Sequence, residues 1–179
     1  MTESPGRGAL FPESLEMLRG LRASRWFTDA EVTATDLRRI LEVARWTGSA
    51  RNRQPWRVHT VRDADTRAEL GRCGDYALHL AQAPVVILLA LDRGGADAEF
   101  DGGRFAQTLI AAAGAFGLGC CPATFFPTAN AERATAIAGF EEPWSVRTGI
   151  ALGWPAPAPP GRSAIPRGRL PLNTLWSGE

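Results

Sequence analysis

The residues of this chain best suited to bind a charged ligand are its arginines. All 20 basic residues are arginine, and the sequence has no lysine. This composition excludes Schiff-base catalysis, the Ser-Lys dyad, the P-loop and the protein-kinase site, because each of them needs a lysine amine. Arginine keeps its proton at working pH, so it can hold a phosphate or stabilise an anion but cannot act as a general base.

Two short arginine clusters lie at opposite ends of the chain. Arg22 and Arg25 flank Ser24 near the start, and Arg167 and Arg169 are separated by one glycine near the end. In an extended segment the second pair would share one side of the backbone. Convergent arginine forks suit a single phosphate group, although ordinary solvated surface is the simpler explanation of the spacing taken alone.

Amide side chains form a second candidate surface. Asn52 and Gln54 lie in the segment TGSARNRQPW (47–56), which has the composition of a loop and precedes a strand pattern. Amides can bind the donor and acceptor edge of a heterocycle. Taken alone, the segment is interpreted as a loop with Trp56 buried behind it.

Metal and acid–base chemistry find little support in the sequence. The only histidines are His59 and His79, and the adjacent Cys120 and Cys121 have no partner pair at Cys-x-x-Cys spacing. We interpret both histidines as structural, and adjacent cysteines on a strand would point to opposite faces.

Two further motifs are weak or absent. There is no Gly-x-Ser-x-Gly elbow to support a hydrolase. Gly114, Gly117 and Gly119 follow a helical pattern and precede a strand pattern, which is the reverse of the order in the dinucleotide-binding fingerprint. We therefore interpret these glycines as a helix stop and as sites of close packing.

Length and composition indicate one globular domain. The chain has 179 residues, is 45% hydrophobic and carries a formal net charge of +1. No strongly basic balance points to nucleic acid or to a membrane surface, and no apolar run reaches the ~20 residues of a membrane helix. With three cysteines and no signal-peptide pattern, a reducing cytoplasm is the expected location.

The elements that must position these residues alternate between helix and strand without regular βα units, which predicts an α+β fold with a mixed sheet. Thr33 and Asp36 stand at capping-box spacing before one helix. The pattern predicts that the helix after this box carries Leu37, Ile40, Leu41 and Ala44 on one face. Further helices are predicted over 13–22, 104–117 and 130–138, with a short one in 63–75. Strands are predicted over 57–62, 84–91 and 145–154, with 117–126 a strand or loop. Residues 1–12 are expected to be flexible, 13–179 to form a single domain, 155–166 to be extended and the tail after it to pack on something.

Five blocks of the sequence, in order, resemble the FMN-dependent nitroreductase family. They are RASRWF, ARWTGSARNRQPWRV, GLGCCPATF, IALGWP and IPRGRLP, and together they span residues 18–175. The second block, preceded by R-A-x-R-x-F, is the most specific of the five. The resemblance implies an α+β fold with a mostly antiparallel sheet flanked by helices, in an intertwined homodimer with FMN at the interface.

The resemblance also implies an activity. Members of the family pass hydride or electrons through flavin N5, from NAD(P)H to nitroaromatics, quinones or similar conjugated acceptors. The flavin would carry the chemistry, so no side chain is predicted to be catalytic, and the backbone of Ala123 and Thr124 would lie near N5.

Cofactor-binding residues follow from the resemblance position by position. Arg22 and Ser24 match the first FMN segment, with Arg22 facing phosphate, and Arg25 matches a cation beside the flavin pyrimidine edge, where it would stabilise the reduced anion. The further matches are Ser49 and Asn52 for the FMN of the other subunit, Pro122, Ala123 and Thr124 along the isoalloxazine, and Arg167 and Arg169 as a phosphate pair. Gln54 of the amide segment is a further cofactor-binding candidate.

The chain departs from the family pattern in several places. Leu21 stands where another arginine is frequent, Ala23 where a serine is frequent, and Gly48 replaces a common proline. Phe125 replaces a frequent glycine and is expected to narrow the pocket. The middle region, 63–83 and 92–101, is short, so the helical excursion that covers the flavin in larger relatives is reduced.

Three alternatives remain open at the level of the sequence. The protein could store or sense flavin without turnover, or act as a flavin oxidase or dehydrogenase that does not use NAD(P)H. It could also be a structural paralogue without FMN.

Overall fold

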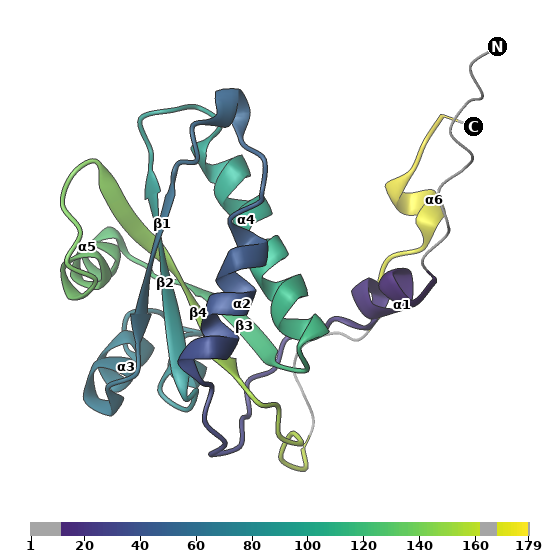
Figure 1. Cartoon of the computed structure of the whole chain (residues 1–179), viewed down its shortest axis with the longest axis horizontal. Helices are drawn as coiled ribbons and strands as arrows, with labels where there is room; N and C mark the ends of the chain where they lie inside the picture. Colours follow the sequence, from purple (N-terminus) through teal and green to yellow (C-terminus); the bar gives the residue numbers. More distant parts are fainter. Residues whose placement is uncertain (1–11, 162–167, 179) are drawn as a thin grey trace.

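The computed structural model describes residues 12–161 and 168–178 and confirms the expected α+β class. A four-stranded sheet in the order β1-β2-β4-β3 has helices on both faces, and each neighbouring pair of strands is antiparallel (Figure 1). The elements are α1 (Pro12–Gly20), α2 (Ala34–Ala44), η1 (Ala50–Asn52), β1 (Trp56–Val61), α3 (Ala64–Gly71), η2 (Leu78–Leu80), β2 (Val85–Asp92), α4 (Ala98–Ala115), β3 (Gly119–Thr124), α5 (Thr128–Ile137), β4 (Trp144–Gly153) and α6 (Leu172–Leu175).

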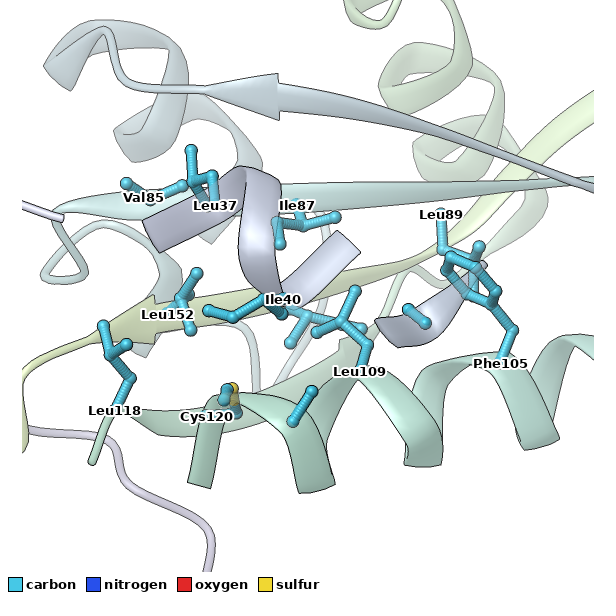
Figure 2. Close-up of a cluster of buried hydrophobic side chains, with 14 of the residues drawn as sticks. Leu37, Ile40, Val85, Ile87, Leu89, Phe105, Leu109, Leu118, Cys120 and Leu152 are labelled. Atoms are coloured by element: carbon cyan, nitrogen blue, oxygen red, sulfur yellow. The ribbon is translucent and has the colours of Figure 1, made fainter. Parts of the chain in front are cut away.

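Strand β2 lies at the centre of the molecule because its side chains are apolar on both faces. Alternate residues enter two separate cores. Val85, Ile87, Leu89 and Leu91 face the core under α2 and α4, which Figure 2 shows, and Val86, Leu88 and Ala90 face the core under α3 and α5. The strand predicted over 84–91 is confirmed within one residue.

Helix α2 begins where its capping box predicts. The Thr33 hydroxyl accepts from the Asp36 N–H at 3.1 Å, and the Asp36 carboxylate accepts from the Thr33 N–H at 3.0 Å. These bonds satisfy two amide groups that the first turn of a helix leaves unpaired. The pattern of buried residues, Leu37, Ile40 and Ala44, then faces α4 and the sheet.

Helix α4 begins six residues before the predicted start at 104. The glycines at 102 and 103 lowered its apparent helix propensity, but Gly102 has a packing role. A Cβ at Gly102 would lie 2.6 Å from Leu91 Cδ1, so a larger residue here would force the Leu91 side chain of β2 to move. The 18-residue helix is about 27 Å long and packs against β2 and β3.

Both ends of the described chain project from the body. Helices α1 and α6 lie away from the sheet (Figure 1), and the C-terminal segment 168–178 exposes Leu170, Leu172, Leu175 and Trp176 by 54–68%. The expectation that the tail packs is therefore not met within one chain. The predicted flexible segment 1–12 lies outside the described residues except for Pro12, where α1 begins.

Candidate functional site

The first site segment, residues 21–25, lies along the edge strand β3. Ala23 forms a parallel bridge with Cys120, and the Ser24 N–H donates to the Cys120 carbonyl at 2.9 Å. The Ser24 side chain fills the space beside Gly119, where an added Cβ would lie 2.5 Å from Ser24 Oγ. The segment is thereby fixed against β3, next to the predicted flavin segment Pro122–Thr124.

Arg22 and Arg169 line the same cavity, although they come from opposite ends of the chain. This arginine cavity has a volume of about 590 Å³ and is lined by Glu16, Leu18, Arg19, Gly20, Leu21, Arg22 and Arg169. Glu16 pairs with Arg19 at 2.8 Å. The cavity thus holds three guanidinium groups and one carboxylate, a balance that suits a phosphate dianion.

Among the described residues, the guanidinium groups of Arg22 and Arg169 have only backbone partners, whereas Arg19 pairs with Glu16. Arg22 Nη1 donates to the carbonyls of Arg19 and Leu21 at 2.7 and 2.8 Å, and Arg169 Nη1 donates to the Gly168 carbonyl at 2.9 Å. Both side chains are exposed. A phosphate can replace these carbonyl acceptors with stronger, charge-assisted ones.

The arginine cavity continues into a less polar cavity along β3 and α4. This second cavity, of about 360 Å³, also contains Arg22 and Arg169 and is otherwise lined by Leu18, Leu21, Ala23, Gln107, Ile110, Cys120 and Pro122. A cationic end joined to an apolar surface matches a ligand with a phosphate at one end and an aromatic ring system at the other. The residues present therefore fit FMN.

Arg25 lies near the buried His79 and the β3 backbone. His79 Nε2 is 3.2 Å from the Cys121 carbonyl oxygen. Burial lowers the pKa of His79 below its ordinary value, and the Arg25 cation lowers it further. The arginine predicted to face the flavin edge is thus close to β3, and the histidine is part of the packed support behind that strand.

The two adjacent cysteines point to opposite cores, as expected for a strand. Cys120 lies in the core under α4 and Cys121 in the core under α5. Burial raises the pKa of Cys120 to about 12 and also raises the pKa of Cys121. Both thiols stay protonated at neutral pH, so neither provides a thiolate nucleophile.

The amide loop, residues 49–54, lies at the other end of α4. The Ser49 hydroxyl accepts from the Gln54 N–H at 2.8 Å, and Gln54 Nε2 donates to Asn52 Oδ1 at 3.1 Å. Arg51, Asn52 and Gln54 all have left-handed backbone angles, with φ of 51–54°. The buried Asp101 carboxylate of α4 accepts from the Ala50 N–H at 2.9 Å and fixes the loop to the helix.

The structure therefore divides the predicted residues into two groups. Those near the arginine cavity and β3 are Arg22, Ser24, Arg25, Pro122, Ala123, Thr124 and Arg169; the second group is Ser49, Asn52 and Gln54. Asp101 under the loop and Ile110 in the cavity are separated by about 14 Å of helix axis at about 1.5 Å per residue. Arg167 lies outside the described residues.

One expectation about the pocket is wrong. Phe125 does not narrow it, because its side chain is fully buried in the core under α5 and packs against Gly149, where a Cβ would lie 2.7 Å from the phenylalanine ring. The residue follows the end of β3 and continues the alternation that places Cys121 and Ala123 in the same core.

Sequence patterns did not indicate Arg19, Gln107 or Ile110 as cavity residues. Arg19 forms an ordinary i, i+3 pair with Glu16 on α1, and the α4 residues lie in a helix that is apolar nearly all round. Their place in the cavity depends on how α1 and α4 approach each other. A single-sequence pattern carries no signal for that approach.

A larger cavity lies elsewhere in the described chain. The α2–β1 groove, about 790 Å³, has an apolar floor of Leu37, Leu41, Trp56, Val58 and Phe105, and Ala34, Arg38, Glu42, Arg45, Arg57, Thr60 and Arg62 complete its lining. Trp56 stacks on Phe105 with ring centroids 5.0 Å apart. The groove is open beside the edge strand β1.

Within residues 12–161 and 168–178, no helix is long and apolar enough to cross a membrane, and no group of three or more His, Cys, Asp or Glu side chains could hold a metal ion.

Comparisons with known proteins match most of the chain. A family model described as Nitroreductase family matches residues 18–78 and 72–154. A protein of Thermus thermophilus named NADH dehydrogenase is 32% identical, over 78% of this chain and 84% of that protein.

Solved structures agree with this match. A structure described as a nitroreductase in complex with FMN, from Desulfovibrio desulfuricans, has a TM-score of 0.78 at 28% identity and covers 99% of this chain and 98% of its own. An FMN-dependent nitroreductase of Clostridium difficile has a TM-score of 0.74 at 21% identity, over 84% of this chain and 92% of its own. The second likeness shows the fold alone.

Proposed function

Because this chain belongs to the nitroreductase family and is an oxidoreductase enzyme, we propose that it binds FMN and transfers hydride or electrons from NAD(P)H to a nitroaromatic, quinone or similar conjugated acceptor. The observation that carries the proposal is the shared cavity of Arg22 and Arg169, which continues along β3 to Pro122. When bound, FMN supplies the redox chemistry, and the protein supplies position and electrostatic field.

The chain's own residues have distinct tasks in this proposal. Arg22 and Arg169 hold the phosphate, with Arg167 as a further candidate from the sequence. Arg25, beside β3, stabilises negative charge at the pyrimidine edge, and the backbone of Pro122, Ala123 and Thr124 borders the ring system. No side chain is needed as a general acid or base.

We assign Ser49, Asn52 and Gln54 to the FMN of a second copy of the chain. Two features support a homodimer: the exposed apolar side chains of the C-terminal segment 168–178, and the open apolar α2–β1 groove. Apolar surfaces of this kind are stabilised by burial against a partner. Residues 13–179 then act as one domain that contributes to both sites.

The first experiment measures flavin in the purified protein and after FMN is added. Arg22→Ala and Arg169→Ala should each weaken FMN binding, because each removes charge-assisted hydrogen bonds of about 1.5–3 kcal/mol, or about 10- to 150-fold in Kd. Arg72→Ala is the matched control, since Arg72 is an exposed arginine at the end of α3. Unchanged FMN affinity in both variants would remove the phosphate assignment.

A second candidate is flavin binding without use of NAD(P)H. The short middle region favours it, whereas the bulk of Phe125 does not, because that ring is buried away from the cavity. Stopped-flow mixing with NADH and with NADPH separates the two functions. Flavin that is reduced by dithionite but stays oxidised with both nicotinamides would contradict the proposed donor.

A further inference from the structure

The Leu21 side chain packs against Gly114 of helix α4. If Gly114 carried a Cβ, that atom would lie 2.6 Å from Leu21 Cδ2, so the end of the Leu21 side chain would have to move. Gly103 in the same helix differs, since a Cβ added there would meet nothing within 4 Å. Alanine favours a helix over glycine, so the glycine at 114 is explained by contact with Leu21 and not by the needs of the helix.

A second close contact with a glycine is made by Ser24, three residues after Leu21. Ser24 occupies the space that a side chain at Gly119 would need, and its N–H donates to the Cys120 carbonyl. In the sequence, Arg22 lies between Leu21 and Ser24, the residues that make these two contacts. Its backbone is therefore held on one side by α4 and on the other by β3, and its guanidinium lines the arginine cavity.

The contact between Leu21 and Gly114 also marks the point where the chain joins the body of the molecule. The preceding helix α1 is exposed at nearly every residue and projects away from the sheet (Figure 1). Without a fixed Leu21, the backbone of Arg22 would be held from one side only. Binding energy is then lost to the ordering of this segment each time a ligand binds.

We propose that Leu21 and Gly114 are a positioning pair that orients Arg22, so that the protein selects flavin with a phosphate over flavin without one. This inference rests on the proposed function, because it names residues that tune the same site. It gives a role to Leu21, the apolar residue directly before Arg22. Leu21 lines both cavities and Gly114 lines neither, so Gly114 acts only through Leu21.

The test compares the dissociation constants of FMN and riboflavin, which differ only in the phosphate, by titration of flavin fluorescence. Gly114→Ala should weaken FMN binding about tenfold, as expected when one charge-assisted hydrogen bond is misdirected, and leave riboflavin binding within about twofold. Gly103→Ala is the control in the same helix and should leave both constants as in the wild type. Thermal unfolding of each variant is measured in parallel.

A compensating variant separates positioning from general damage. Leu21→Val removes one methylene where Gly114→Ala adds one, so the double variant conserves volume and should restore the preference for FMN. If Gly114→Ala does not fold, Leu21→Ala, which adds no atoms, should by itself reduce FMN affinity and spare riboflavin.

Two results would overturn the inference while the proposed function stands. One is wild-type FMN affinity in both Gly114→Ala and Leu21→Ala; the other is an equal loss of FMN and riboflavin binding that follows the loss of thermal stability. A wild-type protein that binds neither flavin would instead refute the proposed function, and the inference with it.

Discussion

At the scale of single residues, the site depends on guanidinium groups held by backbone. Each of the arginines in the cavity can present two parallel N–H donors to a phosphate, which a lysine ammonium cannot. Arg22 and Arg169 are exposed and bonded to carbonyl groups, so a ligand pays little to displace those contacts. The charge of the cavity is therefore available to an anion without rearrangement of the core.

His79 should make the stability of the protein depend on pH. Burial, and then Arg25, lower its pKa below the ordinary 6.5. Between that value and the lower folded pKa, the unfolded chain binds a proton that the native protein does not, so the free energy of unfolding falls as the pH falls below 6.5. Above pH 6.5 this contribution is fully present and constant.

Urea denaturation measured from pH 8 to about 5 checks this prediction. His79→Gln retains an N–H donor but does not titrate, so its stability should decline less steeply below pH 6.5 than that of the wild type. His59→Gln is the control, because His59 is the other histidine of the chain and is exposed on β1. An identical slope in wild type and His79→Gln would contradict the assignment.

At the scale of elements, α4 supports the amide loop through Asp101. Left-handed angles at three non-glycine residues of the loop cost about 1–3 kcal/mol each, and the surrounding contacts must offset them. Asp101→Ala leaves the Ala50 N–H without its acceptor and should lower stability by about 1–3 kcal/mol. Asp101→Asn keeps an oxygen in place and should cost less.

Limited trypsin digestion measures the same effect locally, because Arg51 and Arg53 lie in the loop. Cleavage after these arginines should be faster in Asp101→Ala than in the wild type, while sites on α2 keep their rate. Equal rates at the loop bonds would show that the Asp101 contact does not hold the loop.

The sequence predicted elements well where a local signal exists. The capping box at Thr33 and Asp36 and the apolar run of β2 each express a property of neighbouring residues, and both are confirmed. The start of α4 was placed too late, because the glycines at 102 and 103 weaken the helical pattern. Gly102 allows a close tertiary contact with Leu91, and no local sequence pattern indicates such a contact.

The candidate site was predictable mainly through the family resemblance. Spacing alone did not connect Arg22 with Arg169, and the structure brings them to one cavity. The burial of Phe125 and the contact of Leu21 with Gly114 could not be predicted from the sequence. Both depend on which residues of distant segments lie opposite them. Such pairings are set by packing between elements.

At the scale of the whole molecule, the C-terminal segment should control assembly. Leu172→Glu combined with Leu175→Glu places charges on side chains that are 66% and 68% exposed in one chain and that we propose to be buried in a dimer. Burying each leucine contributes about 1.5–3 kcal/mol, so the double variant should dissociate the dimer at micromolar concentration.

Analytical ultracentrifugation of the wild type and the double variant decides this question. Ser177→Glu, which adds the same charge to a polar position of the same segment, should remain dimeric. A wild-type protein that sediments as a monomer at every concentration would refute the proposed assembly, and a dimeric double variant would show that these leucines do not maintain it.

The regions around Arg22 and Asn52 lie beside different parts of α4, and their separation has a consequence for coexpressed variants. If the two regions of one chain serve different flavins, an Arg22→Ala chain and an Asn52→Ala chain carry defects in different halves of a site. Coexpression would then yield mixed dimers in which one site combines both lesions and the other has none. Two impaired alleles would complement each other, and the mixed population would regain part of the activity that each parent has lost.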